Sequence, residues 1–139
     1  MEHAVTTLPP ATSAPRLAAD IVAVVREGSG IRLDYTPASL ASVDRLIGGI
    51  RREQPPLEAV LPALRGFGAY AGQVLVRTAG ATWVVIGEDE RDRFGQPFGL
   101  RTPDGRMWDP LGRAVLRYEN GPQDSLQRYC LEVTDWARS

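Results

Sequence analysis

The side chains that most often carry out catalysis are scarce in this chain of 139 residues. It has one cysteine, Cys130, and one histidine, His3, and all sixteen of its basic residues are arginines. Ser-His-Asp and Cys-His arrangements within one chain, a Schiff-base lysine and the lysine of a phosphate-binding loop are therefore excluded. We predict no catalytic residue, no metal site and no cofactor, and we expect a protein that is not an enzyme.

The other groups that could do chemistry have ordinary structural explanations. The acidic run 88–92 lacks the residue order of a calcium loop and alternates with arginine, which indicates a solvated loop. Gly66, Gly68 and Gly72 are spaced two and four apart and miss the dinucleotide fingerprint. Cys130 is predicted to be a core thiol, because it shares the apolar face of the last helix with Leu126, Tyr129, Val133 and Trp136. Ser125 is expected to serve the start of the last helix.

Aromatic and arginine side chains are the better candidates for a function, because tryptophan and arginine are enriched at binding hot spots. Our leading hypothesis is a protein-binding surface formed by a predicted hairpin and the neighbouring helix ends, with Arg101, Arg106 and Trp108 as its binding residues. The alternative is a pocket beside a central helix that binds a small molecule or a peptide and is lined by Tyr70, Gln73, Arg77 and Trp83. An enzyme that uses only Asp, Glu, Tyr and Arg ranks third.

The central helix is expected over Leu57–Gly80, where large apolar residues recur at three- and four-residue steps. Five small residues interrupt it, namely Gly66, Gly68, Ala69, Ala71 and Gly72. Each interior glycine costs about 1 kcal/mol relative to alanine, so we expect close contact with another helix or strand to compensate. Pro62 predicts a kink or a restart near its own position.

The remaining helices and strands must place the candidate binding residues around the central helix. Helices are predicted over 15–28, from Pro37, from Pro110 and from Pro122, although the run IVAVV within the first leaves a strand as an alternative. Strands are predicted over 31–36, over 81–87 as a central strand, and in a hairpin turning at Pro103-Asp104-Gly105. This order predicts one α+β domain over 15–139, with a small, mostly antiparallel sheet of three or four strands packed against about five helices. Residues 1–14 are expected to form a disordered tail.

The charge and the composition bear on partners and location. The net charge is −1 and the arginines are scattered, which disfavours nucleic acid as a partner. We find no basic leader or long apolar run at the start and no run of 18 uninterrupted apolar residues, so we expect neither a signal peptide nor a membrane anchor. A single cysteine suits a reducing cytoplasm. We expect another protein as the partner, and the sequence does not indicate an oligomeric state.

Several segments resemble a family of small bacterial proteins known as a domain of unknown function, the DUF3806-like group. The resemblance covers roughly residues 31–130 and rests on LDYTPASL, FGAYAGQVLVR, TWVV, PFGLRTPDGRMWDP and ENGPQDSL. The residues that match the family pattern are Tyr70, Gly72, Trp83, Pro97, Glu119, Asn120, Gly121, Asp124 and Ser125. Gln73 stands where the family has an acidic residue. The resemblance implies a single domain and no known activity.

Overall fold

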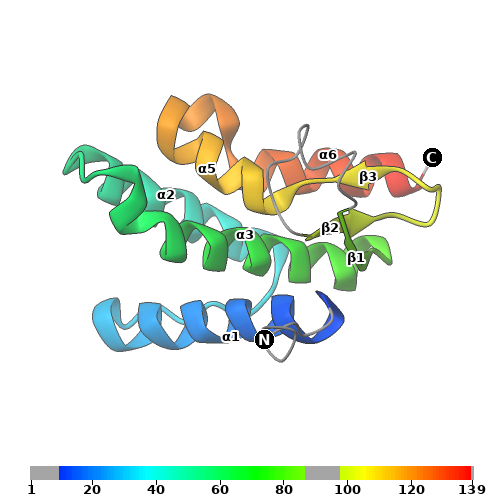
Figure 1. Cartoon of the computed structure of the whole chain (residues 1–139), viewed down its shortest axis with the longest axis horizontal. Helices are drawn as coiled ribbons and strands as arrows, with labels where there is room; N and C mark the ends of the chain where they lie inside the picture. Colours follow the sequence, from blue (N-terminus) through cyan, green and yellow to red (C-terminus); the bar gives the residue numbers. More distant parts are fainter. Residues whose placement is uncertain (1–9, 87–97, 139) are drawn as a thin grey trace, which may run out of the picture.

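The computed structural model describes residues 10–86 and 98–138, which form five α-helices and three strands (Figure 1). The helices are α1 (Pro10–Ser29), α2 (Leu40–Arg52), α3 (Leu57–Ala79), α5 (Pro110–Asn120) and α6 (Leu126–Arg138). The strands are β1 (Thr82–Val85), β2 (Phe98–Arg101) and β3 (Met107–Trp108). Short 3-10 turns, Pro37–Ser39 and Pro122–Asp124, precede α2 and α6. The predicted α+β class is confirmed.

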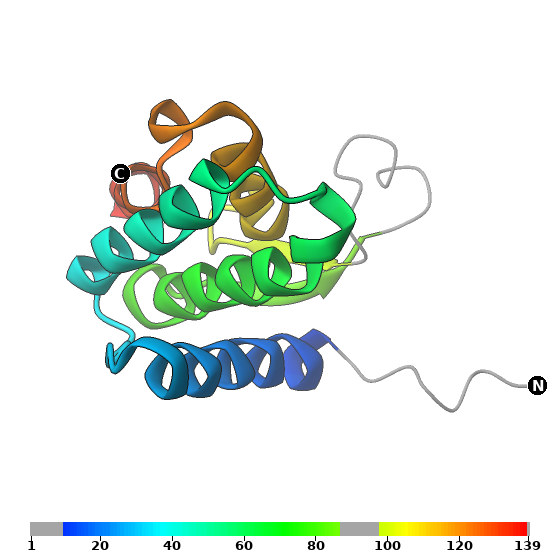
Figure 2. The same ribbon diagram turned by 90° about the vertical axis from the view of Figure 1, so that its left-hand side faces the viewer.

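Helix α3 lies between two layers of helices. Figures 1 and 2 show α1 along one side of it and α2, α5 and α6 on the other. Contacts of α3 with α1, with α5 and with α6 are the most extensive between helices. The middle of α3 is accordingly buried on all sides, with Leu64, Val74 and Leu75 inaccessible to solvent. The prediction of a buried central helix is confirmed.

The sheet is a small antiparallel one beside the last turns of α3 (Figure 1). Its order is β1-β2-β3, with Trp83 paired to Leu100 and Leu100 paired to Trp108. Directly paired residues point to the same face, so these three side chains form one row. The hairpin is therefore confirmed. The expectation that 81–87 supplies a central strand is wrong in position, because β2 is central and β1 lies at an edge of the described sheet.

The small residues of α3 mark close contacts with three other elements. A Cβ atom added to Gly68 would lie 2.5 Å from Leu111 Cα and 2.8 Å from the Pro110 carbonyl oxygen of α5. One added to Gly66 would lie 2.9 Å from Ile21 Cβ of α1, and one added to Gly72 would overlap the indole ring of Trp83. Backbones can approach this closely only where no side chain intervenes. The predicted compensation for these glycines is confirmed.

Helix α3 continues through Pro62 from Leu57 to Ala79, so the predicted restart does not interrupt it. It ends at Gly80, whose left-handed conformation (φ = 66°) lets its N–H reach the Leu75 carbonyl. Within the described residues, α3 is the one helix long and apolar enough to cross a membrane. More than half of that apolar window, 56%, is buried inside the protein, which accounts for its composition.

The connection between α1 and α2 corrects one prediction. Residues 31–36, expected as a strand, pair with no strand among the described residues. Leu33 is buried, but Tyr35 adopts φ = 65° and its N–H is donated to the Tyr70 hydroxyl. The apolar alternation therefore reflects a connector that packs on the core without the backbone hydrogen bonds of a sheet.

Two further predictions need correction. Residues 10–14, assigned to the tail, are helical, and the alternative strand at IVAVV is wrong because this run lies in α1. The run 88–92 lies outside the described residues.

Helix starts follow their local signals. The Thr36 hydroxyl accepts from the Ser39 N–H at 3.2 Å, and Pro37 follows as the first residue of the turn that opens α2. A carboxylate oxygen of Asp109 accepts from the Gly112 N–H at 2.8 Å, with Pro110 at the first position of α5. Side-chain oxygens satisfy N–H groups that have no partner inside the helix. Both predicted starts are confirmed.

The start of α6 depends instead on a residue far away in the sequence, Asp44 of α2. Its carboxylate accepts from the Leu126 N–H at 2.8 Å, the Gln127 N–H at 3.2 Å and the Ser125 hydroxyl at 2.7 Å. Its Oδ1 atom also lies 3.5 Å from Nε of Arg117, a side chain that is only 8% exposed. A negative charge at a helix N-terminus is stabilising, and here it also balances a buried cation. Asp44 thus joins α2, α5 and α6.

We predict that Asp44→Ala lowers the free energy of unfolding by about 3–5 kcal/mol, because it leaves the Arg117 guanidinium buried and uncompensated. Urea unfolding monitored by circular dichroism measures the change. Asp20→Ala, at an exposed aspartate of α1, is the matched control and should stay within about 0.5 kcal/mol of the parent. Equal stability of the two variants would show that Asp44 does not have this role.

Candidate functional site

Tyr70, one of the residues expected to line a pocket, is buried and links α3 to the connector before α2. Its ring is fully buried and lies 4.8 Å from the ring of Tyr35, centroid to centroid. Its hydroxyl accepts the Tyr35 N–H at 2.7 Å and shares a hydrogen bond with the Ser39 hydroxyl at 2.5 Å. Burial raises the pKa of Tyr70, so the neutral phenol holds these contacts.

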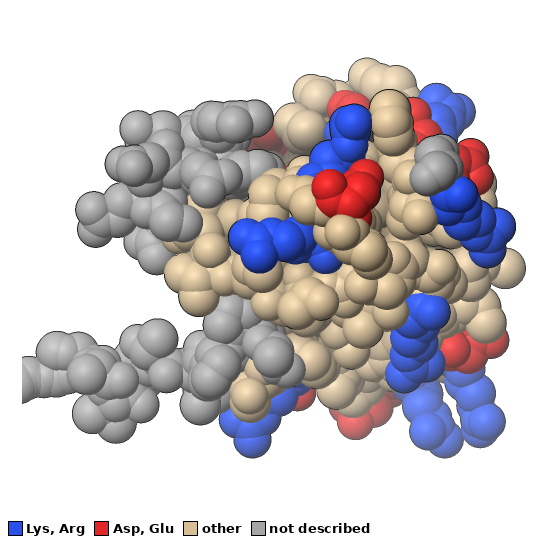
Figure 3. All heavy atoms as spheres, turned by 90° about the vertical axis from the view of Figure 1, so that its right-hand side faces the viewer, with Lys and Arg blue, Asp and Glu red and all other residues tan. Residues whose placement is uncertain are grey.

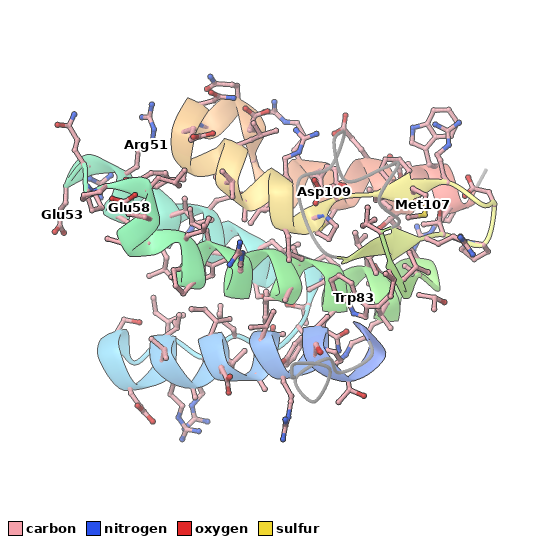
Figure 4. The ribbon with its side chains drawn as sticks, in the orientation of Figure 1. Arg51, Glu53, Glu58, Trp83, Met107 and Asp109 are labelled. Carbon is pink, nitrogen blue, oxygen red and sulfur yellow. The ribbon has the colours of Figure 1, made fainter. Side chains whose placement is uncertain are left out.

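The other three predicted pocket residues also have partners within the fold. Gln73 Oε1 accepts from the Trp83 indole N–H at 2.7 Å, and Trp83 itself is buried beneath the end of α3 (Figure 4). The Arg77 guanidinium lies over the Tyr35 ring, 4.2 Å from its centroid. The Gln73 side-chain amide therefore positions the Trp83 indole. None of the hollows described below is lined by Tyr70, Gln73, Arg77 or Trp83.

The hairpin residues separate into an inward and an outward group. Trp108 donates its indole N–H to the Thr102 hydroxyl at 3.0 Å and packs edge-on against Tyr129, with ring centroids 6.2 Å apart. It is half-buried and belongs to the contact between the hairpin and α6. Arg101 and Arg106 are exposed. Among the described residues, Arg101 has no ion pair or hydrogen bond through its side chain.

Trp136 lies in a different environment from the one that the sequence pattern predicted. We expected it on the apolar face of the last helix, but it is 48% exposed in the last turn of α6. The Arg106 guanidinium lies over its ring, 3.9 Å from the centroid. Its neighbours Asp135 and Arg138 are both exposed, and these charged residues were the available signal that position 136 faces solvent. Trp136 is therefore the exposed tryptophan of this region, and Trp108, which we expected in the binding surface, is half-buried.

The turn of the hairpin is held by a short network. Asp104 Oδ1 accepts from the Thr102 hydroxyl at 2.5 Å and from the Arg106 N–H at 3.1 Å. The hydrogen bond from Thr102 is the main reason that the pKa of Asp104 lies below its usual value. Asp104 also lies 3.8 Å from the Arg106 guanidinium. This network fixes the backbone of the turn and so holds Arg106 where its guanidinium lies over the Trp136 ring.

We call the outward group, Arg101, Arg106, Met107 and Trp136, the hairpin surface. Arg101 and Met107 are paired across β2 and β3, and Arg106 bridges from the turn to Trp136 on α6. Figure 3 views the molecule from the end that carries the hairpin and the C-terminus of α6. Basic and acidic side chains are interspersed there around uncharged surface. The surface therefore combines an aromatic ring with separate guanidinium groups, without a strong field of one sign.

Three hollows lie elsewhere on the described residues. One of about 310 Å³ between α1 and α3 is open and apolar, with Val24 at its rim. One of about 280 Å³ lies where Arg51 donates to the Tyr118 carbonyl at 2.8 Å, at the left end of Figure 4. The third, of about 140 Å³, lies between α3 and α6. The described residues contain no group of three His, Cys, Asp or Glu side chains that could hold a metal ion.

The acids and hydroxyls near α5 have structural partners. Asp109, labelled in Figure 4, caps α5, and burial raises the pKa of its carboxyl group. The Tyr129 hydroxyl accepts from the Asp109 N–H at 2.9 Å. Between α5 and α6, Asn120 donates to Asp124 at 2.8 Å and Ser125 accepts from the Arg128 N–H at 3.2 Å. These hydrogen bonds build the turn from α5 to α6.

Comparison of the chain with known family models, with curated proteins and with solved structures found no match. The resemblance to the domain of unknown function stays a prediction, and any assignment of a site depends on the geometry above.

Tyr129 gives a pH-dependent prediction. Burial raises its pKa in the folded protein well above the value of about 10 of an unfolded tyrosine. The unfolded state therefore loses this proton first, and stability should fall as the pH rises above about 10, by at most about 1.4 kcal/mol per pH unit. Tyr129→Phe should flatten this fall in urea unfolding between pH 8 and 11.

Tyr35→Phe is the matched control, because Tyr35 is more exposed and its pKa is also raised. Its effect on the slope should be the smaller of the two. An unchanged slope for Tyr129→Phe would contradict the buried environment of Tyr129.

Proposed function

We propose that this protein binds another protein through the hairpin surface and acts as a non-enzymatic accessory or interaction protein of the cytoplasm. The observation that carries the proposal is the stack of Arg106 on the exposed ring of Trp136, at 3.9 Å. Tryptophan and arginine dominate binding hot spots because they combine large area with directional donors. An exposed aromatic residue at the hairpin favours protein binding over an enclosed pocket among Tyr70, Gln73, Arg77 and Trp83.

The hairpin surface is also held in place before any partner arrives. Trp136 stands on α6, which is fixed at its start by Asp44, and Arg106 follows a turn closed by Asp104 and Thr102. A side chain held in one position loses less entropy on binding, so more of its contact energy contributes to affinity. Rigid support of this kind is what a recognition surface needs.

The partner we propose presents carboxylate groups beside an apolar patch. Arg101 forms no ion pair within the described part of the chain, and Arg106 shares one exposed contact with Asp104. A carboxylate can pair with a planar guanidinium through two hydrogen bonds, while the Trp136 ring and Met107 supply the apolar contact. An acidic patch on the partner would therefore complement this surface.

A non-enzymatic role agrees with the surroundings of the reactive groups. Burial raises the pKa of the Cys130 thiol and disfavours its nucleophilic thiolate form. Asp109 and Asp44 cap helices, and Tyr70 and Tyr129 accept backbone N–H groups. Each of these groups thus has a structural task.

The test is a native pull-down with the tagged protein, in which Arg101, Arg106 and Trp136 are all changed to alanine. We expect recovery of the partner to fall by about tenfold or more, because hot-spot residues carry most of the binding energy. The matched control changes two exposed arginines and an exposed apolar residue of α1, namely Arg16, Arg26 and Val24. Equal recovery with both triple variants would refute the proposal.

A further inference from the structure

A small hollow between α3, α6 and the turn Pro37–Ser39 is the basis of a second inference, which is independent of the hairpin surface. Its volume is about 140 Å³ and it is the most enclosed of the three hollows described above. Val74 and Cys130, both almost completely buried, lie at its floor. Leu131, Asp135 and Arg138, which are exposed, lie at its mouth.

The inside of this hollow offers little to a polar group. Thr78 and Thr134 form its sides, and their hydroxyls are donated to the Val74 carbonyl at 2.9 Å and to the Cys130 carbonyl at 2.8 Å. The Cys130 sulfur faces the Ala71 carbonyl at 3.7 Å. The hydrogen-bond donors of the floor and sides are therefore already used, and a charged group inside would lose its hydration without a replacement.

We propose that this hollow binds a small, uncharged apolar molecule, or the uncharged apolar ring of a larger one. An apolar cavity of roughly 150 Å³ accommodates benzene, so a six-membered ring fits the space available. The ring would contact α3, α6 and the turn before α2 at once. Because Leu131 is 52% exposed at the mouth, a bound ring would also bring that side chain into apolar contact.

The experiment is a titration of the uniformly ¹⁵N-labelled protein with benzene, followed by NMR. We expect saturable shifts of the backbone amides around Val74, Thr78, Cys130 and Thr134. Pyrazine, a neutral ring of the same size whose two nitrogens would lose their hydration in a hollow without free donors on its floor and sides, should bind at least about tenfold more weakly. Shifts that do not saturate, shifts confined to the hollow between α1 and α3, or equal affinity for pyrazine would each overturn the proposal.

A pair of variants tests the location. Thr134→Leu fills the hollow with a larger apolar side chain and should weaken benzene binding by about tenfold or more. Thr12→Leu makes the same change at an exposed position of α1 and should leave binding unaltered. Circular dichroism checks that both variants are folded. Wild-type affinity in a folded Thr134→Leu variant would overturn the assignment, and the titration of the parent protein decides the matter if that variant does not fold.

Discussion

The fold depends on the close approach of other elements to the slim middle of α3. Gly66 faces Ile21 of α1, Gly68 faces the backbone at the start of α5, and Gly72 faces the indole ring of Trp83. Interiors are packed almost without voids, so the absence of side chains here sets how near these neighbours lie. Through Gly72 and Gln73 the same helix positions Trp83, and through Tyr70 it holds the connector before α2.

A second constraint joins the helices that lie on one side of α3. Asp44 of α2 caps α6 and balances the charge of Arg117 on α5. Gly48 of α2 leaves room for the Arg117 guanidinium, since a Cβ atom added to Gly48 would lie 3.2 Å from Nη2. Because α6 carries Trp136, this contact also supports the hairpin surface. Structural contacts that begin in the core therefore support the proposed binding residues.

Local signals in the sequence predicted most of the helices and strands. They did not predict contacts between residues that are far apart in the sequence. Thr36 and Asp109 cap the helices that follow them, and α3 is buried as its periodicity indicates, because these features depend on neighbouring residues. The strand expected over 31–36 failed because Tyr70, thirty-five residues away, takes up the Tyr35 N–H. The candidate site was predicted only in part. Arg101 and Arg106 are exposed as a binding role requires. Trp108 is half-buried because it packs against Tyr129, and Trp136 is exposed because it lies on a side of α6 that faces away from the core.

The most direct test of the central claim is the free energy of unfolding of Gly68→Ala compared with Gly28→Ala, measured in urea. A methyl group at Gly68 would meet the α5 backbone, whereas one at Gly28 of α1 meets no atom within 4 Å. We expect Gly68→Ala to lose about 1–3 kcal/mol through overpacking. Gly28→Ala should leave the free energy of unfolding unchanged or raise it by up to about 1 kcal/mol, because alanine lowers the backbone entropy of the unfolded chain. If Gly68→Ala is as stable as Gly28→Ala, the close contact around which we arrange the fold does not exist.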